Sequence, residues 1–421
     1  MPSTLYICYF GLREPLVQTQ VLPYLRQLAA GGIRVFLLTF EPQLKRKWGE
    51  EAMRAERERL AAQGVEWRAL AYHKSPSLPA TVYDIAAGAL AASRLVREHD
   101  IDVVHGRSHV AAAVAAAVKR LTGRPFIFDI RGFLPEEYVD AGVWPEGGRL
   151  YRVAKRVERR LLDAADGFVV LTEKARDILF PGHAAPGARP VEVIPCCVDM
   201  SRFRAAAGVS REEVRRELGV EGRRVVVYVG ALGGWYLTEE TAELLAAAHA
   251  EDAKTFSLVL TQSPPEMIAG PLRARGVKDS DFLVRKVAPP EVPRYLKAAD
   301  LAVSFIKPCY SKLSSSPTKL AEYLAAGLPV VCNAGIGDVD AVVESERVGV
   351  IVRELGRESY GRALSAVEEL RREGGLEERC RDAAARRFDL ETVGGESYRR
   401  LYRRVLGARA AALAPARGRR V

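Results

Sequence analysis

Short apolar runs alternate with longer helix-like segments along almost the whole chain. In the first half, the segments between the apolar runs have the spacing of amphipathic helices, near residues 18–30, 50–63, 81–98, 110–121 and 150–164. The apolar runs predict strands at residues 5–9, 35–40, 103–104, 126–130, 168–171 and 191–194. Such an alternation is typical of βαβ units, which form a parallel sheet covered by helices on both faces.

The same alternation begins again after PCCVDMSRF, residues 195–203. Its strands are predicted at residues 225–229, 256–260, 282–287, 301–305, 330–333 and 350–352, with helices near 238–250, 290–298, 318–326 and 360–372. Two such series predict an α/β protein of two Rossmann-like, doubly wound domains that face each other across a cleft. Ligands of such sheets bind beyond the carboxyl ends of the strands.

We place the N-terminal domain at residues 1–194 and the second domain at residues 195–385. The helical pattern continues over residues 377–406. It predicts a C-terminal helix at 386–407 that could pack back on the N-terminal domain. Residues 408–421 are rich in alanine, arginine and proline, which predicts a disordered basic tail.

The chain has 421 residues and a formal net charge of +10. This excess suggests an acidic partner, such as phosphate, anionic lipid or nucleic acid, unless it reflects a general excess of arginine. The six cysteines show no zinc-site spacing and fit a reducing cytoplasm. No run of roughly 18 apolar residues is present, and the N-terminus does not resemble a signal peptide. We therefore expect a cytoplasmic protein with no metal site and no transmembrane helix.

Two common nucleotide-binding motifs are missing. The loop after the first strand, residues 11–15, reads GLREP and contains no GxGxxG, and no GxxxxGK[ST] occurs in the chain. The sequence therefore gives little support to a dinucleotide oxidoreductase or a P-loop NTPase.

The segment SSSPTKLAEYLAAGLPVV, residues 314–331, predicts a helix start that binds a phosphate. Ser316 is a suitable N-cap, with Pro317 at the first helical position. The free amides of Thr318 and Lys319 would point out of the helix start, where the helix dipole is positive. The lysine side chain adds a formal charge, although a solvated lysine on an ordinary helix is the alternative.

Glu322 shares the helix face of Thr318, one turn further along. Its neighbours are mostly apolar, and a carboxylate buried among them needs hydrogen-bond partners. The two hydroxyls of a ribose are suitable donors. The segment therefore suggests a nucleotide with its phosphate at the helix start and its ribose on Glu322, the alternative being an exposed glutamate.

This segment resembles the donor-binding segment of the family-4-type glycosyltransferases of the GT-B fold. VIPCCVDMSRF (193–203) is similar to the family's interdomain motif, and YLKAADLAVSF (295–305) to one of its strands. RPFIFDIRG (124–132) stands where a strand of the acceptor domain ends. With its "RGF" and "SPTKL.EYLA.G.PV" motifs, the chain resembles more narrowly the bacterial polysaccharide-type glycosyltransferases.

The resemblance implies an enzyme that moves a hexosyl group from a nucleotide-diphosphate sugar to a glycan or lipid-linked acceptor. It further implies retention at the anomeric carbon, with the nucleotide sugar as co-substrate and no metal or other cofactor. Glu322 matches the glutamate that binds the donor ribose. By the same matching, Ser315, Ser316, Pro317 and Thr318 would hold the distal phosphate, Gly230, Gly233 and Gly234 would form a glycine-rich turn at the pyrophosphate or sugar, and Arg285 would reach base or phosphate.

Three positions depart from the family pattern. Ser314 replaces a glutamate, Ala231 and the Trp235–Tyr236 pair stand where two basic residues are usual, and Arg131 stands where a histidine is common. Fixed cations stabilise a departing phosphate, so we expect Arg131 and Lys319 to act in catalysis together with Asp129. Arg107 and Arg285 are further candidate cations. Gly11 is expected near the cleft, and so are His105 and Arg107, in a loop after the strand at 103–104. A helix-capping or core role is the alternative for His105. An ion pair of Arg131 with Asp129 or Glu136 is the alternative for that arginine.

Two other functions stay open. The lost charges would suit a nucleotide-sugar-binding partner subunit without catalysis. An epimerase of the same fold would need acid and base groups, of which the chain offers few. Separately, KRKWGEEAMRAERERL (45–60) suggests peripheral contact with anionic lipid through Trp48, although its acids fit a solvated helix. Nucleic acid is not an expected partner.

Overall fold

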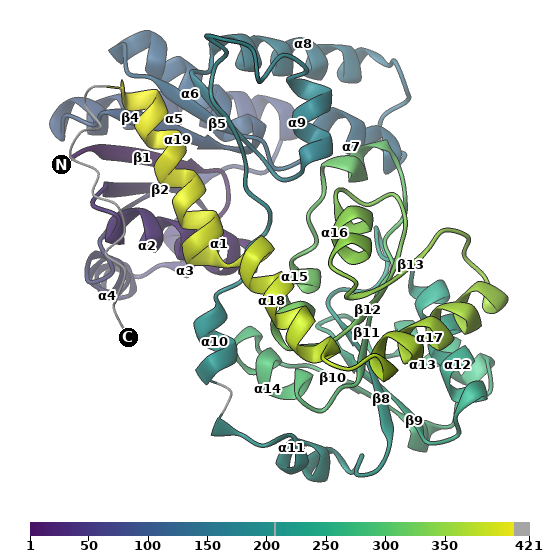
Figure 1. Cartoon of the computed structure of the whole chain (residues 1–421). Coiled ribbons are helices and arrows are strands. Elements are labelled where there is room, and N and C mark those ends of the chain that lie inside the picture. The colour runs from purple at the N-terminus through teal and green to yellow at the C-terminus, as the bar shows by residue number, and fades with distance from the viewer. Residues whose placement is uncertain (206–207, 408–421) are drawn as a thin grey trace. The chain divides into compact units, whose positions relative to one another are not determined.

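The computed structural model describes residues 1–205 and 208–407, which form two compact units (Figure 1). The first unit comprises Met1–Pro195 and the chain from Leu390 onward, and the second comprises Cys196–Asp389. The sequence prediction placed the domain boundaries after residues 194 and 385, and the two units divide after Pro195 and Asp389. The tail predicted at 408–421 lies outside the described residues.

The sheet of the first unit is parallel, with strand order β3-β2-β1-β4-β5-β6-β7. The order reverses between β1 and β4, and the carboxyl ends of such strands are the expected place for a ligand. The strands are β1 (Ser3–Cys8), β2 (Arg34–Pro42), β3 (Val65–Tyr72), β4 (Val103–Arg107), β5 (Phe126–Asp129), β6 (Gly167–Val170) and β7 (Val191–Val193).

Strand β3 was missing from the sequence prediction. Its sequence, VEWRALAY, begins with an alternation in which Val65 and Trp67 are buried while Arg68 is exposed. That alternation is the pattern of a strand covered on one face. A search for continuous apolar runs overlooks it because charged residues interrupt the segment.

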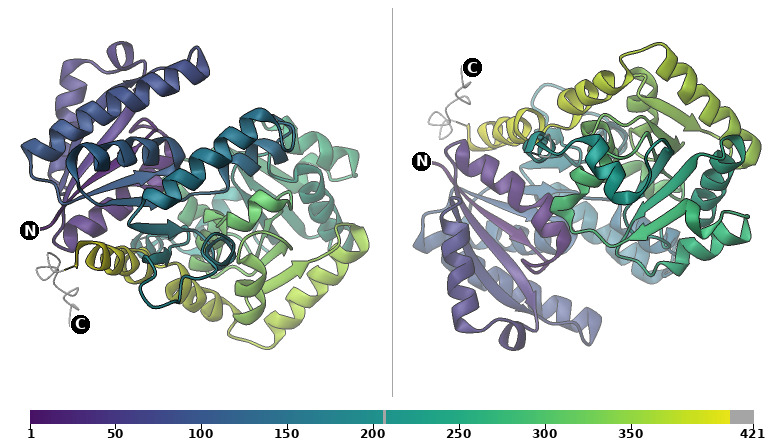
Figure 2. Two further views of the ribbon diagram at one scale, coloured as in Figure 1. Left: turned by 90° about the horizontal axis from the view of Figure 1, so that it is seen from above. Right: turned by 90° about the horizontal axis from the view of Figure 1, so that it is seen from below.

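Helices cover both faces of this sheet. Helices α5, α6 and α8 pack side by side on one face, whereas α2 and α19 lie against the other (Figures 1 and 2). The helices are α1 (Pro15–Gln20), α2 (Leu22–Ala30), α3 (Leu44–Lys47), α4 (Glu50–Ala61), α5 (Ser77–Glu98), α6 (Ser108–Thr122), α7 (Leu134–Asp140), α8 (Arg149–Ala164), α9 (Glu173–Leu179) and α19 (Glu396–Leu406).

The second unit has a parallel sheet with strand order β10-β9-β8-β11-β12-β13. Its strands are β8 (Arg224–Val229), β9 (Thr255–Leu260), β10 (Phe282–Arg285), β11 (Leu301–Ser304), β12 (Val330–Asn333) and β13 (Gly349–Val352). Its helices are α10 (Met200–Ala205), α11 (Arg211–Leu218), α12 (Thr238–Glu251), α13 (Glu266–Ala274), α14 (Val292–Leu296), α15 (Thr318–Ala325), α16 (Val339–Ser345), α17 (Arg357–Arg372) and α18 (Leu376–Phe388).

Strand β8 shows why these strands are apolar throughout. Val225 and Val227 belong to one hydrophobic cluster, and Val226 and Tyr228 belong to another. Successive side chains of a strand point to opposite faces, so helices on both faces require apolar residues at every position. The predicted class, two Rossmann-like doubly wound α/β domains, is confirmed.

The helical stretch predicted at 377–406 is interrupted. Helix α18 ends at Phe388, and a π-helical segment, Leu390–Gly395, separates it from α19. Helix α18 packs against α15 in the second unit, whereas α19 packs on β6 and β7 of the first. The break therefore lies where the chain passes from one unit to the other, and the helical pattern itself does not reveal it.

Helix α19 places a tyrosine in the core of the first unit. The Oη atom of Tyr402 lies 2.9 Å from Oγ1 of Thr4 and 2.9 Å from Nδ1 of His105. All three side chains are buried. A buried polar group that loses its partner is costly, so this contact ties the end of the chain to β1 and β4.

We predict that Tyr402→Phe lowers the free energy of unfolding by about 1–3 kcal/mol, because it leaves buried polar groups unpaired. Urea denaturation measures the effect. Tyr83→Phe is the control, because Tyr83 is 60% exposed and its hydroxyl can be solvated. Equal stability of the two variants would contradict a structural role for the hydroxyl of Tyr402.

Candidate functional site

Three neighbouring strands of the second unit are joined at their carboxyl ends. The loop 230–237 follows β8, and its Trp235 carbonyl accepts a hydrogen bond from the amide of Lys307, 2.8 Å away. Asn333, at the end of β12, accepts from the amide of Ile306 and donates to its carbonyl, both at 2.8 Å. The loops after β8 and β11 and the end of β12 therefore form one connected edge of the sheet.

Gly230 lies close to a charged group at this edge. Its φ is 130°, and a Cβ atom added there would lie 2.9 Å from Nζ of Lys319. Gly233 and Gly234 also have positive φ, 74° and 61°. The resemblance explained these glycines by a pyrophosphate or sugar that approaches the backbone of the turn. The structure adds a second reason at Gly230, since the space beside it holds the ammonium of Lys319.

Lys319 is buried among aromatic rings and is not solvated. Its side chain belongs to the first turn of α15 and is only 7% exposed. Its Nζ lies 4.2 Å from the ring centroid of Tyr228, 4.1 Å from that of Tyr236, and donates a hydrogen bond to the Tyr228 hydroxyl at 3.1 Å. Burial lowers the pKa of Lys319 to about 7. The lysine can therefore gain or lose its charge near neutral pH.

The start of α15 differs from the prediction. The helix begins at Thr318 with Pro317 as N-cap, so the assignment of Ser316 as N-cap was wrong. The Oγ atom of Ser316 instead accepts a hydrogen bond from the amide of Cys196 at 3.0 Å. No side chain of the described residues caps this helix start. The first amides are thus left for water or a ligand.

Glu322 is partly buried and has a partner that sequence reasoning missed. Its Oε1 lies 3.5 Å from Nη1 of Arg202, and its side chain is 17% exposed. Burial raises the pKa of Glu322, and the charge of Arg202 opposes that rise. Arg202 lies on α10 and also donates to the carbonyl of Pro289 at 2.5 Å. The only signal for it was its place in the interdomain motif.

A second lysine, Lys312, was also missed. It is 6% exposed, and its Nζ lies 3.9 Å from the ring centroid of Trp235. Lys312 and Lys319 therefore each stand over an aromatic residue of the loop 230–237. Trp235 and Tyr236 occupy the region where the family usually has a basic residue. The sequence signal was a second lysine in the serine-rich run before α15.

Arg285 ends the edge strand β10 and contacts Tyr295 and Glu217, which lie outside the glycine loop. Its Cζ lies 4.8 Å from the ring centroid of Tyr295, and its Nη1 lies 3.6 Å from Oε1 of Glu217. The structure thus shows Arg285 in a surface ion pair, and the glycine loop and Lys319 come together without it.

In the first unit, Asp129 is the centre of a buried polar network. It ends β5 and is fully buried. Burial alone would raise the pKa of Asp129, but the charges of Arg131 and Arg107 and the nearby imidazole of His105 hold it well below its usual range. Its Oδ2 accepts from Tyr6 at 3.0 Å, Tyr398 at 3.2 Å and Arg107 at 3.4 Å, and its Oδ1 accepts from Arg131 at 3.4 Å.

This network revises three predicted site residues. Arg131 forms the ion pair with Asp129 that was its alternative interpretation, and its side chain is 11% exposed. His105 and Arg107 lie within β4 and are buried, so the expected loop at the cleft was wrong and His105 has the core role that was its alternative. Burial lowers the pKa of His105. Both residues form part of the core that surrounds Asp129.

Gly11 lies in the loop after β1, where it packs against the end of β2. A Cβ atom there would lie 2.8 Å from Cδ of Pro42 and 2.9 Å from Oε2 of Glu41. The carboxylate of Glu41 also accepts from the amide of Leu12 at 2.8 Å. Packing within the first unit therefore accounts for the glycine.

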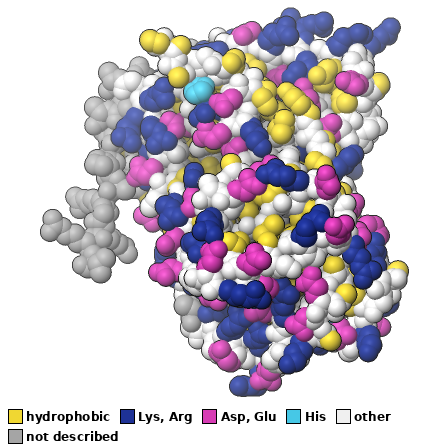
Figure 3. Space-filling model, turned by 45° about the vertical axis from the view of Figure 1, so that its right-hand side comes forward, with side chains coloured by type: hydrophobic (Ala, Val, Ile, Leu, Met, Phe, Trp, Pro, Cys, Tyr) yellow, Lys and Arg dark blue, Asp and Glu magenta, His cyan; other side chains and the backbone are white. Residues whose placement is uncertain are grey.

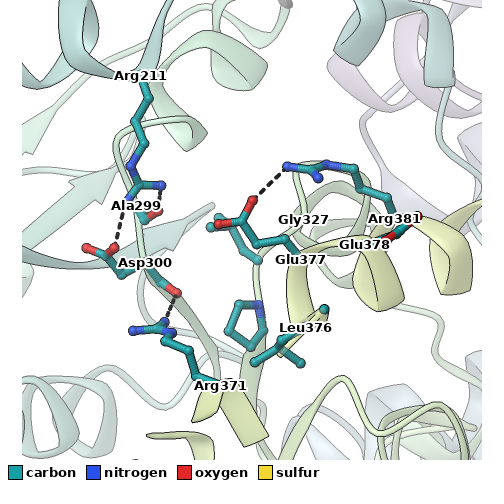
Figure 4. Close-up of a pocket in the computed structure, with 12 residues that line it drawn as sticks. Arg211, Ala299, Asp300, Gly327, Arg371, Leu376, Glu377, Glu378 and Arg381 are labelled. Carbon is teal, nitrogen blue, oxygen red and sulfur yellow. Dashed lines mark hydrogen bonds and ion pairs between the residues drawn. The ribbon is translucent and has the colours of Figure 1, made fainter. Parts of the chain in front are cut away.

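A cavity of about 470 Å³ lies at the other edge of the second sheet, where β11 and β12 begin. Figure 4 shows Arg211 and Arg371 pointing toward Asp300, with distances of 2.5 Å to its carboxylate and 2.7 Å to its carbonyl. Glu377 pairs with Arg381 at 3.0 Å. These contacts hold the elements together, and the cavity is separate from the edge that carries Lys319.

Residues 1–205 and 208–407 contain neither a cluster of metal ligands nor a membrane-spanning helix. Within those ranges no group of three or more His, Cys, Asp and Glu side chains is placed to hold a metal ion. No helix in the same ranges is long and apolar enough to cross a membrane.

Two protein families match the chain in succession. The glycosyl transferase 4-like domain matches residues 17–197, and the glycosyl transferases group 1 match residues 223–368. The alpha-maltose-1-phosphate synthase of Mycolicibacterium smegmatis is 27% identical over 210 residues, 48% of this chain and 52% of that protein. The matched part thus spans about half the length of this curated relative.

Solved structures share the fold at low identity. A glycosyltransferase from Rickettsia africae is 12% identical with a TM-score of 0.71, over 97% of this chain and 99% of that one. HepE of Anabaena, solved with UDP and glucose, is 15% identical with a TM-score of 0.67, over 96% of this chain and 100% of that one. The two family matches fall in the order of the two Rossmann-like units, and the chain therefore belongs to the group 1 glycosyltransferases of the GT-B fold.

Proposed function

We propose that this protein transfers a hexosyl group from a nucleotide-diphosphate sugar to a glycan or lipid-linked acceptor, with retention at the anomeric carbon. The observation that carries the proposal is the buried ammonium of Lys319 beside Gly230, at the uncapped start of α15. Family membership supports it. So does the likeness to Anabaena HepE, which was solved with UDP and glucose.

The donor diphosphate would bind at the first turn of α15. Its negative charge would raise the pKa of Lys319 and hold the lysine protonated. The amides of Thr318 and Lys319 would add the partial positive charge of the helix start. When the sugar leaves, charge grows on the diphosphate, and a fixed cation in a site with little water stabilises it strongly. Lys312 would supply a second cation at the loop 230–237.

The donor ribose would bind Glu322. In the free protein this carboxylate is held by Arg202 at 3.5 Å, a long contact for an ion pair. Two ribose hydroxyls would donate to the same carboxylate without removing the arginine. The residues around Glu322 and the start of α15 would then bind the nucleotide as a unit.

Asp129 is unsuited to act as a nucleophile or a base. Two tyrosines and two arginines donate to its carboxylate, and its pKa is held well below the usual range. Its role would be to position Arg131 and Arg107. We therefore propose that the departing phosphate itself accepts the proton of the acceptor hydroxyl, on the same face of the sugar. The resemblance to the family is the ground for a further part of the proposal, that no metal takes part.

A nucleotide-sugar-binding subunit without catalysis is the second candidate. The position of the family's first glutamate is taken by Ser314, which is buried and donates to the carbonyl of Ser311 at 2.7 Å. No carboxylate therefore stands there to bind the donor sugar. Sustained turnover by the purified chain would exclude this alternative.

We predict that Glu322→Ala weakens nucleotide-sugar binding by about 1.5–3 kcal/mol, roughly tenfold or more, because a charged hydrogen-bond acceptor is lost. A thermal-shift screen of UDP-, GDP-, ADP- and TDP-sugars, followed by calorimetry, measures this and identifies the base. Glu344→Ala, which removes a surface ion pair with Arg353, is the control. Unchanged affinity in folded Glu322→Ala would refute the ribose role.

We predict that donor affinity falls as the pH rises above about 7. The pKa of Lys319 is about 7 in the free protein and must rise when an anion binds. Below the free value the lysine is already charged, so affinity is flat there, and it is lost as the pH rises toward the bound value. Calorimetry in buffers of different ionisation enthalpy should show proton uptake above pH 7. Lys319→Met should abolish that uptake, and uptake that persists in the variant would assign it to another group.

We predict that the first product has the anomeric configuration of the donor, because the carboxylate of Asp129 is held by its hydrogen bonds and is unsuited to act as a base or a nucleophile. Proton NMR of the product before mutarotation measures it. An inverted product would contradict the same-face mechanism.

Arg131→Gln should lower kcat more than KM if Arg131 acts in the transition state.

A further inference from the structure

Helix α8 of the first unit, RLYRVAKRVERRLLDA, is fixed by its inner face. Leu161 is buried, and so is Glu158, whose carboxylate pairs with Nε2 of His109 at 3.1 Å. Lys155 also pairs with Glu158 and reaches Oε1 of Glu136 at 2.9 Å. These ion pairs occupy the carboxylate of Glu158, so it does not pair with the arginines on the outer face of the helix.

The outer face carries an exposed apolar stripe. Leu150 is 53% exposed, Val153 is 51% exposed and Val157 is 41% exposed. Their spacing of three and four residues places them on one side of the helix. An isolated exposed leucine needs no explanation, whereas three aligned apolar side chains on a charged helix indicate a contact surface.

Arginines lie next to this stripe. They are all exposed: Arg149, Arg152, Arg156, Arg159 and Arg160. Within the described residues, none of these guanidinium groups has a recorded hydrogen bond or ion pair. Some other surface arginines are paired, as Arg273 is with Glu266 and Asp279. Figure 3 shows dark blue side chains gathered along the upper edge of the molecule, where Figure 1 draws α8, with yellow side chains close by.

We propose that α8 binds an anionic lipid surface. Unpaired arginines match the phosphates of lipid headgroups in charge and geometry. The apolar stripe would enter the interface between headgroups and acyl chains. This stripe distinguishes lipid from an acidic polysaccharide, because a soluble polyanion offers nothing for three apolar side chains to bury. The surface is independent of the proposed sugar transfer, and its binding can be measured without donor or acceptor.

The membrane contact suggested at residues 45–60 depended on Trp48, and the structure does not leave that side chain on the surface. Trp48 is 7% exposed, packs on Trp67 with ring centroids 5.0 Å apart, and lies under the guanidinium of Arg13 at 3.8 Å. It is not available to lipid. The neighbouring helix α4 mixes exposed acids, such as Glu51 and Glu58, with its arginines.

Flotation of the full chain with vesicles tests the proposal. We expect binding to vesicles of phosphatidylcholine and phosphatidylglycerol in equal parts, little binding to phosphatidylcholine alone, and weakening by salt. Arg152→Gln/Arg156→Gln should reduce the partition coefficient about fivefold for each charge removed. Val153→Ser/Val157→Ser should also reduce it, because the apolar contact is lost. These are surface positions, so folding should be preserved, and circular dichroism verifies it.

Arg54→Gln/Arg57→Gln on α4 is the matched control, because it removes the same charge from another exposed helix. It should bind anionic vesicles as the unaltered protein does. Equal losses of vesicle binding in the α8 and α4 arginine variants would mean that binding depends only on the net charge of the protein. That result would overturn the role of α8. So would an unaltered protein that does not float. Binding to alginate that depends on the arginines but not on the valines, without vesicle binding, would assign the face to a polyanion.

Discussion

A lysine ammonium buried between two tyrosine rings, with no ion pair among the residues that the structure describes, is an unfavourable arrangement that the second unit maintains. Removing a charge from water is costly unless a counter-charge replaces the water. The aromatic faces of Tyr228 and Tyr236 offset part of this cost, and the lowered pKa of Lys319 reflects the rest. Gly230, the loop 230–237 and the start of α15 are shaped around this one group. A ligand that brings negative charge would relieve the arrangement.

The first unit solves the opposite problem. Asp129 is a buried anion, and tyrosine hydroxyls and arginines surround it until its charged form is favoured. The two buried charges therefore differ in kind. Asp129 is satisfied and rigid, and is suited to holding arginines in place. Lys319 can still bind an anion. This contrast between a satisfied carboxylate and an unsatisfied ammonium separates a supporting residue from a ligand-binding one.

The fold could be predicted from sequence because buried parallel strands are apolar on both faces, as Val225 to Tyr228 show. Strand β3 escaped because its apolar residues alternate with charged ones. The family motifs led to Lys319, Gly230 and Glu322. Their neighbours did not follow, because the contacts of Lys312 with Trp235 and of Arg202 with Glu322 join segments far apart in the sequence. The burial of Trp48, likewise, depends on Trp67 and Arg13, and no local pattern reports such contacts.

The chain crosses between its units twice, and the two crossings are neighbours, since Val198 and Asp389 form a bridge. The second unit is therefore one continuous segment, inserted into the first. During synthesis it is complete once Asp389 has emerged, whereas the first unit still lacks Tyr398 and Tyr402. The part of the protein that begins first is thus finished last. A ribosome that stops short of α19 releases a complete second unit joined to a first unit with an open core, which quality control can recognise.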